Sequence, residues 1–453
     1  MPIQLHQWQT AALAKWHSAK RQGIIEAVTG SGKTYVAFGA LEQLQAEDRR
    51  LNTLIVVPTV PLMNQWLNKL SQLFPGRSIG RIGDGHTDDF SRFPFACIAI
   101  INSAVRHVDK LLGHTRHGTV KSFLIADECH HYINAPVFRR IRDFPFHYTL
   151  GLSATIEPYE VSGLGRVIYE YGFREANRDD LVPSFDLVNT TVSLTPGEQA
   201  DYESLTEKIS DQIVLIRDAF HFELLNVPER EFFTRLKQLM SREDGSEDPV
   251  IKRLFGLIFR RTKIYYMSER KMALATDLIR LLVQDGKKKV IVFFERIDSA
   301  EDVQEDVALE AASKLRTRIQ EVMQIWCKVF HSGLQRTERD EVLREFRANK
   351  QSALLACRCL DEGIDIPEVD AAILVASTQS RRQRIQRIGR TLRRGDGEKR
   401  PLIVTLYCQE TRDENVVQND EEIFAGVATF HETSERSCVN HVKTVLARKE
   451  QNA

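Results

Sequence analysis

The sequence predicts an α/β protein with two parallel-sheet lobes in tandem and a helical insertion between them. Three observations predict this fold class: a glycine-rich loop near the start, an arginine-dense segment near the end, and two sets of short apolar runs that alternate with helical stretches. The loop can hold a nucleotide triphosphate. The arginines can reach the same phosphates only if two lobes close on each other, so the pairing suggests a nucleotide-driven clamp.

Each set of apolar runs has the length and spacing of strands in one sheet. The first set covers residues 24–28, 53–57, 95–101, 123–126 and 148–152, and the second covers 290–294, 326–330, 353–356, 371–376 and 402–407. Near-continuous apolar strands separated by helices are typical of parallel sheets covered on both faces. We expect the domains to be a first lobe over 1–175, a helical insertion or linker over 176–270, a second lobe over 271–410 and a polar tail over 411–453.

The glycine-rich loop lies between an apolar strand and a stretch of helical spacing. It reads Thr29-Gly30-Ser31-Gly32-Lys33-Thr34. The two glycines let the backbone turn its N–H groups toward phosphate oxygens, and Lys33 reaches the β- and γ-phosphates. The Thr34 hydroxyl can ligate Mg²⁺, and the following helix N-terminus favours the same phosphates. The alternative is a glycine-rich turn that binds nothing.

Two carboxylates follow the apolar strand 123–126, namely Asp127 and Glu128. In a Mg²⁺-nucleotide enzyme Asp127 would hold the metal and Glu128 would polarise the attacking water as general base. A solvated acidic strand end is the alternative. His130 and His131 come next, but adjacent side chains point apart and no ligand cluster lies nearby in sequence, so we favour a hydrogen-bonding role over protein-bound zinc.

At this point the chain resembles the superfamily 2 helicases and translocases, and the string Asp-Glu-Cys-His-His indicates the DExH side of that group, with XPB-like and RadD-like members. The resemblance covers about residues 3–408 in the correct order. Further matching segments follow in order along the chain. They are the glutamine segment that ends at Gln9; Pro58 and Thr59 together with Leu62, Gln65 and Trp66; the strand end at Ser103; the string Ser153-Ala154-Thr155; and residues 290–294, 331–333, 355–367 and 386–393. The resemblance implies RecA-like lobes.

The same resemblance assigns expected roles around the nucleotide. Gln9 would sense adenine, and Gly363 and Asp365 would meet the ribose and phosphate side across the cleft. Gln386 would help position the water. Arg390 and Arg393 would be arginine fingers that offset charge on the γ-phosphate. The residues expected to couple hydrolysis to lobe movement are His130, Ser153 and Thr155.

The resemblance also assigns contacts to the nucleic-acid backbone. The expected residues are Pro58, Thr59, Ser103, Ser332 and Cys357. Cys357 sits where relatives often carry a hydroxyl, and a thiol is a weaker donor. A second departure is Ile156, which follows Ser-Ala-Thr where relatives often have proline.

Other charged and aromatic segments have two interpretations. Arg381, Arg382, Arg384 and Arg394 fit either a solvated or salt-bridged surface or a phosphate-contacting one. Within the insertion, helical spacing over 203–220 and 229–240 fits either a lever or a packing bridge, with a loop over 241–249. Its aromatic residues fit either base stacking or core packing; they are Phe220, Phe222, Phe232 and Phe233.

Composition limits the classes of protein. With 453 residues, 42% hydrophobic and 27% charged, the chain can bury real cores. Lys plus Arg and Asp plus Glu are 62 each, so nucleic-acid binding must come from a local basic groove. Seven cysteines without paired metal-site spacing fit a reducing compartment. We expect a cytoplasmic protein, since no signal peptide or membrane-length apolar run is visible.

These features predict an ATP- and Mg²⁺-dependent helicase or translocase. The string Cys-His after Asp-Glu favours DNA, although phosphate contacts alone do not exclude RNA. One alternative is an ATP-gated nucleic-acid sensor or recruiting subunit without processive unwinding; another is a P-loop enzyme for a small molecule. The sequence contains no nuclease constellation, so we expect strand cutting to need a partner chain, such as a nuclease in a repair or defence assembly.

Overall fold

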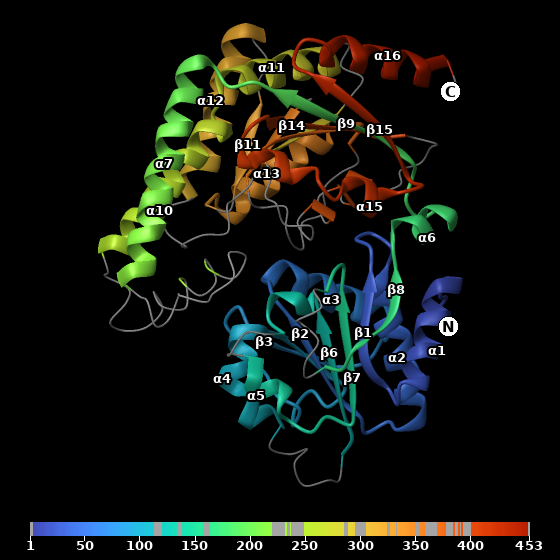
Figure 1. The fold of residues 1–453 in the computed structure, drawn as a ribbon. Coiled ribbons are helices and arrows are strands. Elements are labelled where there is room, and N and C mark those ends of the chain that lie inside the picture. Colours follow the sequence, from blue (N-terminus) through green and yellow to red (C-terminus); the bar gives the residue numbers. More distant parts are fainter. Residues whose placement is uncertain are drawn as a thin grey trace.

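The computed structural model describes most of the chain. The described residues are 3–112, 120–133, 138–156, 164–219, 232, 236, 249–284, 289–294, 305–323, 327–331, 333–348, 353–357, 369–376, 384–385, 388–389, 391–392 and 400–451. They form two α/β lobes, one above the other in Figure 1, joined through β8 and α6. The predicted fold class, two parallel-sheet lobes with helices between them, is confirmed.

The first lobe is built on an eight-stranded sheet. Its strand order is β4 (His86–Thr87), β3 (Ile79–Gly83), β5 (Ala96–Ile100), β2 (Asn52–Val57), β6 (Ser122–Asp127), β7 (Tyr148–Ser153), β1 (Gln22–Ala27) and β8 (Val167–Tyr171). Its helices are α1 (Gln7–Ser18), α2 (Lys33–Glu47), α3 (Val60–Leu73), α4 (Ile101–Leu112), η1 (Cys129–His131), α5 (Arg139–Arg142) and α6 (Phe173–Arg178). Neighbouring strands run parallel except for the short β3–β4 pair. The carboxyl ends of β2, β5, β6 and β7 therefore meet at one edge, where an open α/β sheet binds its ligand.

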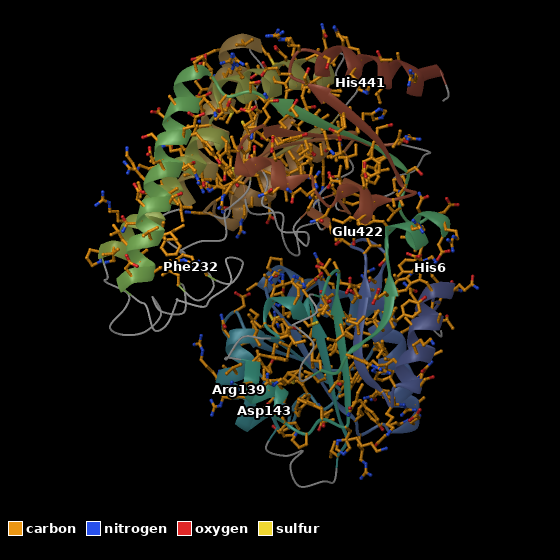
Figure 2. All side chains as sticks on the ribbon, in the orientation of Figure 1. His6, Arg139, Asp143, Phe232, Glu422 and His441 are labelled. Carbon is orange, nitrogen blue, oxygen red and sulfur yellow. The ribbon has the colours of Figure 1, made fainter. Side chains whose placement is uncertain are left out.

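The second lobe is built on a seven-stranded parallel sheet. Its strand order is β11 (Lys328–His331), β12 (Ala353–Cys357), β10 (Val290–Phe294), β13 (Ala371–Ala376), β14 (Leu402–Cys408), β9 (Phe185–Val192) and β15 (Ala428–Ser434). Its helices are α11 (Glu269–Val283), α12 (Glu305–Met323), α13 (Arg336–Arg347), η4 (Arg412–Val416), α15 (Asp420–Phe424) and α16 (Cys438–Gln451). His441, labelled in Figure 2, marks α16 on the side of this lobe away from the first.

All ten strands predicted from apolar runs are present, with ends within two residues of the prediction. Five further strands were not predicted: β3, β4, β8, β9 and β15. The strand β9 carries polar residues at buried positions, which hides it from a search for apolar runs. Asp186 bonds to Arg400 at 2.9 Å and to His431 at 3.0 Å, so its charge is satisfied inside the lobe.

The lobe boundaries differ from the predicted ones at two places. The sequence predicts a helical insertion or linker between the lobes from 176 and a polar tail from 411. Instead, β9 lies within the second sheet, between β14 and β15, so the chain enters the second lobe at Phe185. The segment after 410 also belongs to this lobe, because β15 pairs with β9 and α16 packs on α11.

The helical part of the insertion is a projecting arm of two helices, α7 (Pro196–Ala219) and α10 (Pro249–Tyr266), which pack along each other (Figure 1). Of the second predicted helix only Phe232 and Leu236 are described, and both are helical. Phe232 is 1% exposed and packs in the arm's own apolar cluster (Figure 2), so it is a core residue. Phe220, Phe222, Phe233 and nearly all of the predicted loop 241–249 lie outside the described residues.

The two lobes share an apolar contact beside α6. Phe424 of α15 packs its ring at 5.0 Å from Phe173 of α6 and at 5.5 Å from Phe185 of β9. Through such residues one continuous apolar cluster reaches both lobes. In the described part of the chain, no helix has the length and apolar character needed to cross a membrane.

Candidate active site

The glycine-rich loop has the backbone that the sequence predicts for phosphate binding. Gly30 and Gly32 both have positive φ angles, 87° and 85°, and α2 begins directly after Gly32. Ser31 donates its hydroxyl to the Val28 carbonyl at 2.7 Å, which fixes the turn. The Thr29 hydroxyl is buried and has no hydrogen-bond partner among the described residues. Left-handed glycines, a helix N-terminus and an unsatisfied hydroxyl together fit a bound triphosphate. Thr34 lies in the first turn of α2.

Gln9 braces this loop from α1. Its side-chain nitrogen donates to the Gly32 carbonyl at 3.0 Å, and its side-chain oxygen accepts from the His6 backbone N–H at 2.8 Å. His6, labelled in Figure 2, marks the start of α1. A Cβ atom added at Gly32 would lie only 2.9 Å from the Gln9 nitrogen, so the fit between the two is close. The adenine contact predicted for Gln9 stays a prediction.

Asp127 and Glu128 lie at the carboxyl end of β6 and approach the loop. Lys33 Nζ contacts Glu128 Oε1 at 2.5 Å. Asp127 is 2% exposed, and its two oxygens accept from the Trp66 indole N–H at 2.7 Å and from the Glu128 backbone N–H at 3.0 Å. Burial and the neighbouring Glu128 charge raise the pKa of Asp127 to about 6. This concentration of buried negative charge fits a divalent cation.

The backbone of Glu128 is strained. Its φ is +46°, in the left-handed region that few residues other than glycine adopt. Such conformations cost on the order of 1–3 kcal/mol and cluster at functional sites. The turn separates the Glu128 side chain from that of Asp127, which lets one carboxylate face Lys33 while the other stays against Trp66.

The three residues predicted to couple hydrolysis to lobe movement are in contact. His130 Nδ1 lies 2.8 Å from Ser153 Oγ and 3.5 Å from Glu128 Oε2. Ser153 donates its hydroxyl to the Thr155 carbonyl at 2.8 Å, so the Ser153 oxygen can only accept from His130, and Nδ1 carries the hydrogen. A continuous chain therefore connects Glu128 to the end of β7.

The arginine-dense segment reaches this site from the second lobe. Residues 384, 385, 388, 389 and 391 are helical. A Cβ atom built on Gly389 would lie 3.2 Å from the Thr29 Cβ and 3.7 Å from the Phe173 ring. Hence the helix backbone beside Arg390 approaches the phosphate loop directly. Six predicted site residues lie outside the described residues, and their roles stay predictions: Ser332, Gly363, Asp365, Gln386, Arg390 and Arg393.

The predicted nucleic-acid residues have different environments. Pro58 and Thr59 are half-buried between β2 and α3, and Ser103 is half-buried in the first turn of α4, which follows β5. Because β2 and β5 are neighbours, these residues lie at one edge of the sheet. Cys357 is different, since its side chain is 1% exposed and its thiol donates to the Ala308 carbonyl at 3.4 Å. Its thiol faces the core of the lobe, so we remove Cys357 from the residues proposed to touch nucleic acid.

Two interactions of the site could not be predicted from the sequence. Trp66 was assigned only by resemblance, and its bond to Asp127 joins residues 61 positions apart. Arg384, for which a surface position was expected, is 2% exposed and forms a buried bidentate pair with Asp420. Neither pairing has a local sequence signal, since each depends on how distant elements pack.

The fold and this site define a class of protein. A phosphate-binding loop and two strand-end carboxylates share one sheet, and a second α/β lobe brings an arginine-bearing helix to the loop. This arrangement is that of a two-lobed P-loop nucleotide hydrolase.

Comparison with known proteins gives the family. Residues 2–158 match the family model described as type III restriction enzyme, res subunit, and residues 271–395 match the helicase conserved C-terminal domain. The chain is 27% identical over 420 residues to the DNA 3'-5' translocase XPB2 of Sulfurisphaera tokodaii, across 91% of this chain and 83% of that protein. It is 26% identical to Rad25 of Haloarcula marismortui over 405 residues, which is 87% of this chain but 51% of Rad25.

Solved structures agree on the fold. The helicase domain of Pyrococcus furiosus Hef superposes with a TM-score of 0.57 at 19% identity, over 92% of this chain and 98% of that one. The DNA-bound restriction-modification enzyme LlaBIII superposes with a TM-score of 0.60 at 14% identity, over 96% of this chain and 31% of that one. The chain belongs to the superfamily 2 helicases and translocases, is similar to XPB-type members, and is an ATP-hydrolysing enzyme.

Proposed function

We propose that the protein is a DNA translocase or helicase in which Mg²⁺ and ATP close the two lobes and hydrolysis reopens them. The observation that carries this proposal is the approach of Gly389 to Thr29, because it brings the arginine-dense helix of one lobe to the phosphate loop of the other. A cycle of closing and opening can move backbone contacts along a strand if the affinities of the two lobes alternate.

The site residues divide the work of hydrolysis. Lys33 would leave Glu128 to bind the β- and γ-phosphate oxygens, and Glu128 would then accept a proton from the attacking water. Thr34 and Asp127 would hold Mg²⁺, which would neutralise phosphate charge. Arg390 and Arg393 would stabilise the charge that develops on the γ-phosphate, with Gln386 orienting the water. Gly363 and Asp365 would contact the ribose side.

The chain His130–Ser153–Thr155 supports coupling between hydrolysis and movement. It begins beside Glu128 and ends at the residues that follow β7. A change in the Glu128 hydrogen bonds on nucleotide binding would therefore alter the end of β7. We propose that this change accompanies lobe movement.

DNA is the proposed substrate because XPB2 and Rad25 are named for action on DNA. Pro58, Thr59 and Ser103 would contact its backbone, and Ser332 would do so from the second lobe. The second candidate function is an ATP-gated sensor that recruits a partner such as a nuclease. The specific observation that favours it is the projecting α7–α10 arm, which offers a surface beyond the two lobes.

Parallel ATP turnover assays with no polymer, single-stranded DNA, duplex DNA and RNA test the proposal. We expect DNA to stimulate turnover at least about tenfold, and we expect ATP-dependent displacement of streptavidin from biotinylated DNA as a measure of movement. DNA-stimulated turnover without displacement would support the sensor. Equal turnover with and without any polymer would contradict both functions.

A further inference from the structure

Arg384 is held in a buried ionic contact that fixes its orientation. Its Nε and Nη2 atoms each bond to one carboxylate oxygen of Asp420, and Nη2 also donates to the Thr405 hydroxyl at 3.1 Å. Both charged side chains are almost fully buried. A bidentate arginine–carboxylate pair defines the plane as well as the position of the guanidinium group. The arginine-dense helix is therefore tied to α15 at Arg384.

Asp420 has a second anchor in the sheet of the second lobe. One of its oxygens also accepts from the Asn189 side-chain nitrogen, at 3.3 Å. Asn189 lies on β9 and Thr405 on β14, which are paired strands. The carboxylate thus joins the arginine-dense helix to β9 as well as to α15, and Arg384 itself adds a bond to β14. Movement of this helix relative to the sheet would break several buried contacts at once.

The helix α15 also contacts the first lobe. Phe424 packs on Phe173 of α6, and the same Phe173 ring lies 3.7 Å from the position of a Cβ on Gly389. Glu422, labelled in Figure 2, marks this helix on the side of the second lobe that faces α6. Asp420 therefore reaches the arginine-dense helix at Arg384, and Phe424 reaches it through Phe173 near Gly389.

We propose that Asp420 is a positioning residue for ATP hydrolysis. Through Arg384 it fixes the placement of the arginine-dense helix against the phosphate loop, so α15 supports the hydrolytic apparatus. This inference rests on the proposed function, because it assumes that Arg390 and Arg393 act on the triphosphate. Asp420 itself does not touch the nucleotide, and its effect passes through the helix that carries Arg384.

The chain offers a matched control for a purely structural effect. Lys271 of α11 and Asp413 of η4 form another fully buried ion pair between the segment after 410 and the rest of the lobe. Asp413 also accepts from the Cys408 backbone N–H at 2.9 Å. Asp413→Asn and Asp420→Asn each leave a buried cation without its counter-charge, which is strongly destabilising. Only the second change loosens the arginine-dense helix.

The experiment compares Asp420→Asn, Asp413→Asn and Arg390→Ala with the unchanged chain, using kcat, KM for ATP, and the affinity for ADP with beryllium fluoride relative to ADP. We expect Asp420→Asn to lower kcat about 10- to 100-fold with KM changed less than about threefold, since a small misplacement of a catalytic group has effects of this size. It should also lose most of the preference for ADP with beryllium fluoride. Asp413→Asn should lower Tm comparably while kcat and this preference stay within about threefold.

The outcomes distinguish the positioning role of Asp420 from the proposed role of Arg390 in ATP hydrolysis. If Arg390→Ala reduces kcat and Asp420→Asn behaves like Asp413→Asn, the positioning role is wrong and the proposed function stands. If Arg390→Ala leaves kcat unchanged, the proposed role of the arginines is wrong. If Asp420→Asn does not fold, Asp420→Glu replaces it, because the longer side chain keeps the charge but shifts the guanidinium group of Arg384. We expect a kcat loss of about threefold to tenfold there, and an unchanged kcat would overturn the inference.

Discussion

Lys33 and Glu128 contact each other in this structure. In the proposed hydrolysis Lys33 would instead bind phosphate oxygens, and Glu128 would accept a proton from the attacking water. Their 2.5 Å contact is largely shielded from water, so Lys33 already occupies one carboxylate oxygen of Glu128. A triphosphate offers Lys33 several negative oxygens, which makes exchange of partners favourable. This contact supports a link between phosphate binding and release of Glu128, the proposed general base.

Glu128→Gln separates these two events. The amide keeps the size of the side chain but cannot accept a proton from water, so we expect turnover to fall about 10²- to 10⁴-fold while ATP still binds. Fluorescent-nucleotide binding and phosphate release measure the two steps. Lys33→Ala is the comparison, because it should lose nucleotide affinity as well as turnover. Normal turnover in either variant would contradict the assigned roles.

Gly389 is predicted to be sensitive to a single methyl group. A Cβ there would lie 3.2 Å from the Thr29 Cβ, so Gly389→Ala requires the loop or the helix to shift by a few tenths of an ångström. We expect kcat to fall about tenfold with little change in Tm. Gly256 of α10 is the matched control, since a Cβ there meets no atom within 4 Å. Gly256→Ala should leave kcat unchanged, and equal effects of the two changes would contradict the close contact.

Asp127 should make the metal-free protein less stable at high pH. Folding raises its pKa to about 6 from 3.8, so its bound proton stabilises the fold at low pH, and this contribution is lost as the pH rises through about 6. Asp127→Asn cannot ionise and keeps an acceptor for Trp66. In EDTA and without nucleotide, we expect the variant to melt a few degrees above the unchanged chain near pH 8. The difference should shrink near pH 5. A lower Tm for the variant at both pH values would refute this.

The sequence located the residues of the phosphate loop and the strand ends because their spacing is local. Lys33 begins a helix after a glycine turn, and Asp127 and Ser153 end apolar strands, so each position follows from adjacent residues. The partners of Asp127 and Arg384 could not be found in this way. Trp66 and Asp420 meet them only after whole elements have packed, and no spacing rule in the chain encodes that contact.

At the scale of elements, the difference between local sequence signals and long-range contacts also separates the predicted strands from the missed ones. β10 and β13 are buried and wholly apolar, so an apolar run in the sequence marks where each strand begins and ends. β9 is almost as buried, but it carries Asp186 and Asn189, whose partners come from β15 and from residues near 400 and 420. A strand whose polar groups are satisfied by distant residues cannot be predicted from its own hydropathy.

The helix α3 connects the proposed nucleic-acid edge to Asp127, the carboxylate proposed to hold Mg²⁺. It begins after Thr59, and two turns later Trp66 donates to Asp127 and packs edge-on against Phe38 of α2, with ring centroids 5.0 Å apart. Trp66 therefore lies between the helix of the phosphate loop and the strand-end carboxylate. Its indole N–H holds one orientation of the Asp127 carboxylate.

Trp66→Phe tests this contact. The phenyl ring keeps most of the packing but has no N–H donor, so Asp127 loses an orienting bond. We expect the Mg²⁺ concentration for half-maximal turnover to rise about tenfold, as for loss of a partner of a metal ligand. Trp16→Phe is the control, because Trp16 is equally buried and donates its indole N–H to the Thr149 carbonyl at 2.8 Å, away from Asp127. The same Mg²⁺ shift in both variants would show a general loss of packing.

At the scale of the whole molecule, a neutral chain must bind a polyanion. Lys plus Arg and Asp plus Glu cancel at 62 each, so the molecule as a whole supplies no net attraction for DNA. The proposed contacts gather at the carboxyl ends of β2 and β5, where Pro58, Thr59 and Ser103 lie. Any electrostatic affinity must therefore come from cations grouped locally along the path of the strand.

Salt dependence distinguishes such a groove from non-ionic binding. Each phosphate neutralised in a groove releases counterions, so the logarithm of the DNA association constant should fall linearly with the logarithm of salt concentration, with a slope of about −0.7 to −0.9 per contact. Fluorescence anisotropy with labelled DNA between roughly 50 and 200 mM salt measures this slope. Lys33→Ala should show the same slope as the unchanged chain when ATP is absent, because Lys33 is assigned to the nucleotide. A flat profile would exclude a groove that follows phosphates, and a smaller slope for Lys33→Ala would place Lys33 on the DNA path.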